Sequence, residues 1–190
     1  MKKPILYVTI GLPASGKSTF LRRLNAVSVY SADAVRGEWF GDEGLQYTDA
    51  FIRKQGADPS ALSDREKERI ANPLVWEEVF RSVEQALAEG KDCAIDGTNA
   101  SKWVRKNIIR RFRKYAGICG IWFKTDFERC RERDAARPRT VGEDVLRRIA
   151  GTFEIPHLEE GFDALEERDE NGNLLRRQAK EWFRDAELPE

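Results

Sequence analysis

The sequence is poor in histidine and cysteine, and each scarcity excludes a class of site. His157 stands alone, so zinc sites built on histidine pairs are excluded and a Ser-His-Asp hydrolase is disfavoured. Cys93, Cys119 and Cys130 are odd in number and form no C-x-x-C pair, so we expect buried, reduced thiols. If the chain is an enzyme, its general base is therefore expected to be a carboxylate.

Long apolar runs are also missing. No stretch reaches the roughly 18 residues of a membrane span, and no membrane partner is expected. The opening Met1-Lys2-Lys3 leads into too short an apolar segment for a secretory signal, which favours a cytoplasmic location. With 190 residues, 41% hydrophobic and 35% charged, the chain suits a single domain over 1–190.

The chain has no net charge, but its charges are unevenly distributed. Lys and Arg number 33, as do Asp and Glu. Residues 101–150 hold fifteen basic and six acidic side chains, whereas residues 151–190 hold five and twelve. A local basic field suits a polyphosphate or the end of a nucleic acid better than a long duplex, although solvated arginine-rich helices would give the same count.

Short apolar segments of strand type alternate with segments of helical spacing. The expected strands are 4–10, 27–30, 92–96 and 118–123. The expected helices are 17–25, 31–40 with Ser31 or Asp33 as its cap, a helix with Pro73 in its first turn that stops at Gly90, 101–115, 126–136 and 142–152. This alternation predicts an α/β fold, a parallel sheet flanked by helices on both faces, with ligands at the carboxyl edge of the strands.

Two segments fall outside this alternation. Residues 41–60 are rich in Gly, Asp and Pro and are expected to form a mobile connection. Asn171-Gly172-Asn173 resembles a turn, which predicts a terminal hairpin within a C-terminal extension over about 156–190.

The strongest motif is GLPASGKS at 11–18, a P-loop of the form G-x-x-x-x-G-K-[ST] between a strand and a helix. Its glycines let backbone amides surround phosphates, Lys17 bridges phosphates, and the Ser18 hydroxyl is a Mg²⁺ ligand. ATP and Mg²⁺ are the expected cofactors. The expected ATP-binding residues here are Gly11, Pro13, Ala14, Ser15, Gly16, Lys17, Ser18 and Thr19.

Asp33 and Arg36 follow the second expected strand and lie one helical turn apart. A carboxylate there can take the proton of an acceptor hydroxyl, and an arginine can hold the acceptor in line. A helix cap for Asp33 and a surface position for Arg36 are the plainer alternatives.

Asp96-Gly97-Thr98-Asn99 follows the strand at 92–96. An acid at that position can hold Mg²⁺ through water or orient the acceptor, and Thr98 and Asn99 can bond phosphate or acceptor. A turn followed by helix caps would also explain these residues.

A cluster of arginines surrounds Pro138, and we interpret residues 129–142 as a lid. Arg133 and Arg137 are one turn apart and would face the same side. Their guanidinium groups would neutralise the transferred phosphoryl group, which makes both ATP-binding residues and Arg137, with Lys17, catalytic. The cluster consists of Arg129, Arg131, Arg133, Arg137 and Arg139.

The motifs TIGLPASGKSTF, SADAVR at 31–36, DGTN at 96–99 and RDAARPRTVGEDVLRRI at 133–149 resemble the phage-type polynucleotide 5′-hydroxyl kinases, which are P-loop kinases of the AAA_33 type. The resemblance covers about 150 residues. It implies that Asp33 is the general base for a 5′-hydroxyl, that Arg36 holds the acceptor's 3′-phosphate, and that Arg133 and Arg137 are the lid pair. Relatives often read S-D-T-N where this chain has DGTN, which separates Asp96 from the family pattern.

The leading hypothesis is therefore ATP-dependent phosphorylation of a 5′-hydroxyl on DNA or RNA, with a role in end repair in a bacterial or phage-infected cell. A kinase for a hydroxymethylated base such as 5-hydroxymethyluracil, and kinases for nucleosides, antibiotics or sugar nucleotides, including zeta-toxin-like enzymes, are the alternatives. A nucleotide-dependent switch without an acceptor is a third class. Oligomeric state and the choice between ATP and GTP are not determined by these residues.

Overall fold

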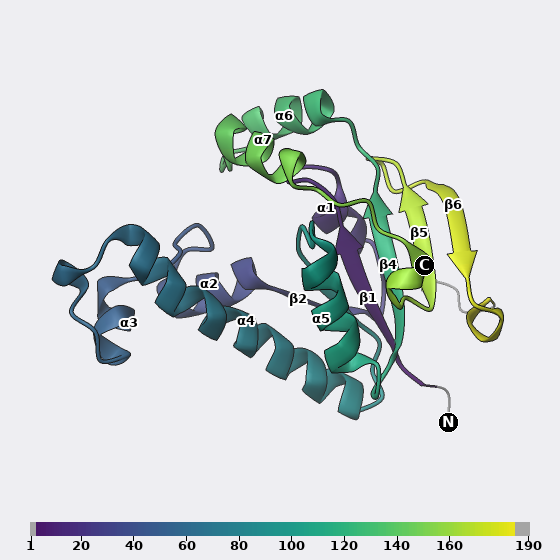
Figure 1. Cartoon of the computed structure of the whole chain (residues 1–190), viewed down its shortest axis with the longest axis horizontal. Coiled ribbons are helices and arrows are strands. Elements are labelled where there is room, and N and C mark those ends of the chain that lie inside the picture. The colour runs from purple at the N-terminus through teal and green to yellow at the C-terminus, as the bar shows by residue number, and fades with distance from the viewer. Residues whose placement is uncertain (1–2, 185–190) are drawn as a thin grey trace. The chain divides into compact units, whose positions relative to one another are not determined.

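The protein is described by a computed structural model over residues 3–184, which contains one six-stranded sheet with flanking helices (Figure 1). The strands are β1 Ile5–Ile10, β2 Ser28–Ser31, β3 Cys93–Asp96, β4 Gly117–Phe123, β5 Ala164–Arg168 and β6 Leu174–Ala179. Their order is β2-β3-β1-β4-β5-β6. β1 pairs in parallel with β3 and β4, and β4 with β5, whereas β5 and β6 are antiparallel. The predicted α/β class and the predicted terminal hairpin are confirmed.

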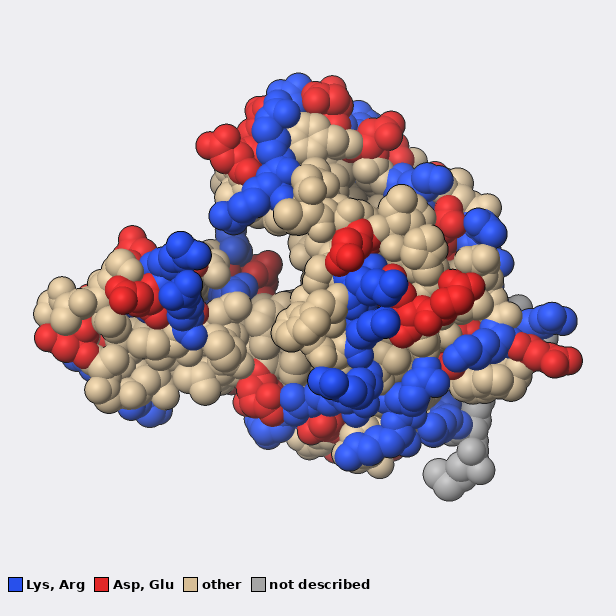
Figure 2. Space-filling view, viewed as in Figure 1, with Lys and Arg blue, Asp and Glu red and all other residues tan. Residues whose placement is uncertain are grey.

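The helices match most of the expected positions. They are α1 Lys17–Leu21, α2 Ala32–Phe40, α3 Asp49–Lys54, α4 Asp64–Ala88, α5 Lys102–Phe112, α6 Phe127–Ala135 and α7 Glu143–Gly151. Short 3-10 turns lie at η1 Pro59–Ala61, η2 Leu158–Glu160 and η3 Glu181–Phe183. In Figure 2, Lys and Arg side chains gather around α5, within the segment whose charge count is most basic.

Two expectations about local structure were wrong. The connection over 41–60 contains α3, because the Thr48 side chain caps it by accepting from Phe51 N–H and Phe51 stacks on Trp39. Pro73 lies inside the 25-residue α4 and not in its first turn. The exposed proline is tolerated because the buried stripe of α4 continues past it at four-residue spacing. That stripe is Ala71, Val75, Val79 and Val83.

The chain divides into two compact units, one of residues 1–29 and 84–190 and one of residues 30–83. We call them the sheet unit and the insert unit. The sheet unit has a core on the strands, with Tyr7 and Phe123 among its members. The insert unit has a core of its own around Phe40 and Ile52. The single domain expected over 1–190, including residues 185–190 outside the described part, stays a prediction.

The three cysteines are free and buried, as expected, and burial raises the pKa of the Cys130 thiol to about 11. Within residues 3–184 no helix has both the length and the apolar character needed to cross a bilayer.

Candidate nucleotide site and acceptor pocket

The P-loop connects the carboxyl end of β1 to the start of α1. Two of its glycines adopt conformations that other residues rarely adopt. Gly11 has φ +150° and Gly16 has φ +107°. A Cβ on Gly16 would lie 2.5 Å from the backbone oxygen of Glu170, which is closer than atoms can approach. The second glycine of the motif is therefore required both by backbone conformation and by close packing against the β5–β6 turn.

Lys17 is a buried cation held by neutral groups. Its Nζ donates to the backbone oxygens of Gly11 at 3.1 Å and Leu12 at 2.6 Å, and to Ser15 Oγ at 3.3 Å. Burial lowers its pKa to about 8, partly offset by the attraction of Asp96. Because no carboxylate pairs directly with this ammonium among the described residues, its charge is available to an anion in the loop.

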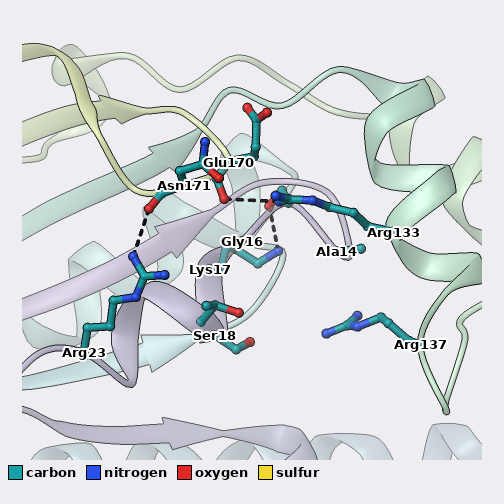
Figure 3. Close-up of a pocket in the computed structure, with 11 residues that line it drawn as sticks. Ala14, Gly16, Lys17, Ser18, Arg23, Arg133, Arg137, Glu170 and Asn171 are labelled. Carbon is teal, nitrogen blue, oxygen red and sulfur yellow. Dashed lines mark hydrogen bonds between the residues drawn. The ribbon is translucent and has the colours of Figure 1, made fainter.

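A pocket of about 240 Å³ opens beside Lys17, and four basic side chains face a single acidic one in its lining. Figure 3 shows Arg133 donating to the backbone oxygen of Glu170 at 3.1 Å and Arg23 donating to that of Asn171 at 3.2 Å. The lining residues are Ala14, Ser15, Gly16, Lys17, Ser18, Thr19, Arg23, Arg133, Arg137, Glu170 and Asn171. The surplus of positive charge, held on backbone carbonyls, suits a polyphosphate.

The predicted lid, residues 129–142, covers most of α6 and the segment that leads from it to α7. Asp134 is buried and accepts hydrogen bonds from the backbone N–H groups of Val141 and Gly142. This carboxylate ties the end of α6 to the start of α7, and it lies 4.0 Å from the Arg137 guanidinium. Of the five arginines expected in the lid, only Arg133 and Arg137 line the pocket, which are the two that the spacing selected.

Three lining residues were missed by sequence reasoning: Arg23, Glu170 and Asn171. A turn at 171–173 was expected, but nothing in its sequence indicates that this connection packs on the P-loop helix. Gly172 makes that packing possible, because a Cβ there would lie 2.7 Å from the Phe20 ring. The Asn-Gly pair could have indicated a tight turn beside a neighbour, but it could not have named the neighbour.

The DGTN segment braces the end of β1. The buried Asn99 donates from Nδ2 to the backbone oxygen of Thr9 at 2.8 Å, and the Gly11 N–H donates to the backbone oxygen of Thr98 at 3.0 Å. Asp96 lies with Oδ1 3.2 Å from the Thr9 hydroxyl. Asn99 has φ +42°, in the left-handed region that asparagine adopts more readily than most non-glycine residues. These hydrogen bonds show a structural role for this segment, and its predicted contacts with an acceptor stay a prediction.

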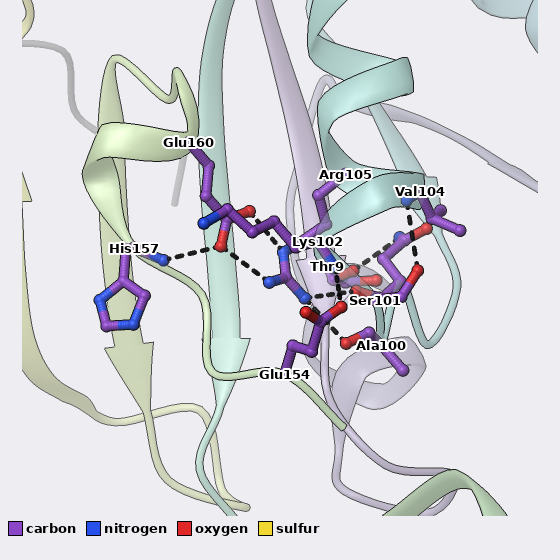
Figure 4. A network of polar contacts seen from close by, with 10 residues as sticks. Thr9, Ala100, Ser101, Lys102, Val104, Arg105, Glu154, His157 and Glu160 are labelled. Atoms are coloured by element: carbon purple, nitrogen blue, oxygen red, sulfur yellow. Dashed lines mark hydrogen bonds and ion pairs between the residues drawn. The ribbon is translucent and has the colours of Figure 1, made fainter. Parts of the chain in front are cut away.

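A buried ion pair also contacts this segment, and sequence reasoning missed it. The Arg105 guanidinium donates two hydrogen bonds of 2.8 Å to the Glu160 carboxylate, and both side chains are at most 1% exposed (Figure 4). Arg105 also donates to the backbone oxygens of Asn99 at 3.1 Å and Ala100 at 2.9 Å. The Arg105 guanidinium therefore connects Glu160 to the turn before α5, and its hydrogen bonds hold that turn in place.

Asp33 and Arg36 lie in the insert unit, and the structure brings them together. Arg36 Nη1 is 3.0 Å from Asp33 Oδ1, and Arg36 Nη2 donates to Asn72 Oδ1 at 2.9 Å. Ser31 caps α2 by accepting from Ala34 N–H, so the Asp33 carboxylate is not the cap. Asp33 is exposed while its arginine partner is buried. An exposed carboxylate anchored in this way can accept a proton from a bound hydroxyl.

A second pocket, of about 540 Å³, adjoins this pair within the insert unit. Its lining consists of Arg36, Gln46, Arg65, Glu68, Arg69, Asn72 and Pro73. We call it the acceptor pocket, after the role that the sequence predicts for Asp33 and Arg36. Within residues 3–184 no group of three or more His, Cys, Asp or Glu side chains could hold a metal ion. Ser18 lines the first pocket, and its hydroxyl is the donor that a phosphate-bound Mg²⁺ would use.

The sheet order and the P-loop define a P-loop kinase fold, and a family comparison gives the family. The profile of the AAA domain family AAA_33 matches residues 6–156, so the chain belongs to that family. No curated protein sequence matches the chain.

Three solved structures share this fold at low sequence identity. A chain of the Pnkp1/Rnl/Hen1 RNA repair complex is 20% identical with a TM-score of 0.58, covering 95% of this chain and 50% of that one. A gluconokinase from Sinorhizobium meliloti 1021 is 14% identical with a TM-score of 0.54, covering 89% and 84%. A chain of the PezAT toxin-antitoxin system of Streptococcus pneumoniae is 15% identical with a TM-score of 0.56, covering 99% and 75%. The chain spans about half the length of the repair-complex relatives that it matches.

Proposed function

We propose that the protein is an ATP-dependent polynucleotide kinase that phosphorylates the 5′-hydroxyl end of DNA or RNA. The acceptor oxygen forms a bond to the γ-phosphorus as the bond to the β,γ-bridging oxygen breaks and ADP leaves. Asp33 takes the hydroxyl proton. Lys17 and Arg137 stabilise the charge on the transferred phosphoryl group, and Arg133 holds the nucleotide.

The observation that carries this proposal is the Asp33–Arg36 pair beside a cationic pocket. A buried arginine that holds an exposed carboxylate gives an acceptor side with both a base and an anion-binding group. A nucleotide switch needs no such pair, because it has no acceptor to deprotonate. The pair therefore favours a kinase with an anionic acceptor over a switch.

Mg²⁺ would be held by the Ser18 hydroxyl and the nucleotide phosphates, with Asp96 in contact through water. When bound, the ion would neutralise phosphate charge and orient the γ-phosphate. Thr9 supports this role for Asp96, because its hydroxyl lies 3.2 Å from the carboxylate and keeps it at the end of β3.

Similarity to a chain of an RNA repair complex supports a nucleic-acid acceptor and a role in end repair. Similarity to a gluconokinase supports phosphorylation of a small hydroxylated molecule as the competing function. A hydroxymethylated base within DNA is a third acceptor that the same Asp33 would serve.

Transfer from γ-labelled ATP to a panel of acceptors tests the proposal. The panel holds 5′-hydroxyl DNA and RNA oligonucleotides, a duplex with 5-hydroxymethyluracil, nucleosides and gluconate. We expect label at the 5′ ends of oligonucleotides. Label confined to the modified duplex or to small molecules would reassign the acceptor, and phosphate release without any labelled acceptor would indicate a switch.

Asp33→Asn tests the base, with Glu38→Gln on the exposed surface of the same helix as its control. We expect Asp33→Asn to lower kcat by about 10²–10⁴-fold, the usual contribution of a general base, and Glu38→Gln to leave it unchanged. Full transfer by Asp33→Asn would show that another group takes the proton.

A further inference from the structure

The lining of the acceptor pocket has a net positive charge. Three arginines and one glutamate line it, together with two amide side chains and a proline. Arg36 comes from α2, Gln46 from the segment before α3, and the others from α4. All of them belong to the insert unit, so the pocket is formed within one compact unit.

Arg36 retains a buried donor without a partner. Its side chain is 10% exposed, and its Nη1 and Nη2 atoms bond Asp33 and Asn72. Its Nε, in contrast, is buried and has no hydrogen-bond partner among the described residues. A buried guanidinium N–H without a hydrogen-bond partner is costly, and this one belongs to a residue that lines the pocket.

Arg65 and Arg69 add two exposed guanidinium groups, one turn apart on α4. In the described part of the chain neither forms a hydrogen bond or an ion pair. Of the nearby acids, Asp64 accepts from the Tyr47 hydroxyl and Glu66 from Ser63, while Glu68 lines the pocket together with the two arginines. In Figure 2, Lys and Arg side chains lie over the first half of α4 as Figure 1 draws it.

We propose that the acceptor pocket binds the phosphodiester backbone of the acceptor strand at more than one phosphate. Arg36 binds the phosphate next to the reacting nucleoside, and Arg65 and Arg69 bind the phosphates that follow. Arginine suits this task because its planar fork matches phosphate oxygens and stays charged. Gln46 and Asn72 supply the neutral polar groups that the sugar can bond.

This inference rests on the proposed function and narrows its substrate class. A pocket with one anion subsite would accept a nucleoside 3′-monophosphate as well as an oligonucleotide. A pocket with further subsites on α4 selects a polymeric acceptor, because only a polymer presents a second phosphate.

The test compares two acceptors in the double variant Arg65→Gln/Arg69→Gln. We expect the KM for a 5′-hydroxyl oligonucleotide to rise at least about tenfold with kcat unchanged, as expected when a ground-state contact is lost. The KM for a nucleoside 3′-monophosphate should stay the same. The control is Arg53→Gln/Lys54→Gln, which removes two exposed charges from the last turn of α3 in the same unit.

Binding of a fluorescent oligonucleotide without ATP gives a readout independent of turnover. The double variant should weaken binding and reduce the slope of log K against log salt by about 1.4, the value for two phosphate contacts on a single strand. The control should change neither the KM nor the slope.

The outcomes separate the two proposals. Oligonucleotide binding that depends on Arg65 and Arg69, without any phosphorylation, would reject the kinase and keep the phosphate site. Phosphorylated oligonucleotides with an unchanged KM in the double variant would keep the kinase and overturn the site. Equal losses for both acceptors, or for the control variant, would also overturn it.

Discussion

The nucleotide pocket and the acceptor pocket are both cationic, but they hold their charges differently. In the nucleotide pocket, Lys17, Arg23 and Arg133 donate to backbone carbonyls. In the acceptor pocket, Arg65 and Arg69 extend from a helix and form no hydrogen bond or ion pair within residues 3–184. Backbone anchors hold a charge at one point without neutralising it, whereas unanchored arginines can follow a variable ligand. The first arrangement suits an invariant triphosphate and the second suits a flexible strand.

The largest difference expected between the two pockets is whether the anchored cations serve every acceptor alike. Lys17→Met should lower kcat by about 10²–10³-fold, the loss seen when one preorganised charge donor to a transition state is removed. The loss should be equal for all acceptors, unlike the selective loss in Arg65→Gln/Arg69→Gln. Lys106→Met, which removes an exposed lysine of α5, is the control. A loss of kcat that differs between acceptors would show that the nucleotide pocket also takes part in choosing the acceptor.

The next effect tests how much the buried Arg105–Glu160 pair stabilises the sheet unit, which carries the nucleotide pocket. Glu160→Gln leaves the buried Arg105 guanidinium without its counter-charge, and loss of one partner of a buried pair costs about 3–5 kcal/mol. Urea unfolding should show this decrease in the free energy of unfolding. The exposed neighbour Glu159→Gln should change it little. Equal stability of both variants would mean that the pair does not support the DGTN turn.

A pH series tests the buried charge of Lys17. Its pKa of about 8 in the free protein means that the ammonium loses its proton as the pH rises through that value. Affinity for ADP should therefore fall by about tenfold per pH unit above 8, while affinity for adenosine, which has no phosphate, should not. Calorimetric titration measures both. A flat profile for ADP would show that Lys17 is not the group that binds phosphate.

The same lowered pKa predicts the stability of the free protein. Unfolded lysine keeps its proton up to about 10.5, so between pH 8 and 10.5 the unfolded chain binds more protons than the folded one. The contribution of Lys17 to the free energy of unfolding should therefore rise with pH in this window. Saturating ADP should remove the rise, because bound phosphate restores the charged form. Urea unfolding with and without ADP measures the difference.

The smallest effect concerns the β5–β6 turn, whose residues Glu170 and Asn171 line the nucleotide pocket. Arg23→Ala removes the hydrogen bond to the backbone oxygen of Asn171 and should raise the KM for ATP about fivefold, in line with a single hydrogen bond. The neighbouring Arg22→Ala, which does not line the pocket, should leave the KM unchanged. An equal change in the KM for ATP in the two variants would show that the β5–β6 turn does not contact the nucleotide.

The fold could be predicted from the sequence wherever short-range patterns were strong. The P-loop, the alternation of strands and helices, and the turn at 171–173 are local signals, and the structure follows them. Pro73 and α3 were misjudged, because burial of neighbouring side chains outweighed the helix-breaking residue and the loop-like composition.

The site was predictable in part for the same reason. Lys17 belongs to a contiguous motif, and Arg133 and Arg137 are separated by one turn, so local patterns were enough to select them as candidates. The ion pair of Arg105 with Glu160 joins residues 55 positions apart, and neither lies in a motif with recognised chemistry. Arg65 and Arg69 resemble ordinary charged positions of an exposed helix until the pocket beside them is known.

By itself, the sequence determined the P-loop, the Asp33–Arg36 spacing and the choice of Arg133 and Arg137, because each depends on residues within one turn or loop. Only the tertiary structure decided that the turn at 169–173 packs against Gly16, and that Arg36 meets Asn72 from another helix. These contacts follow from the path of the chain through the sheet and from the core of the insert unit. No local pattern encodes which distant segment will arrive beside a given residue.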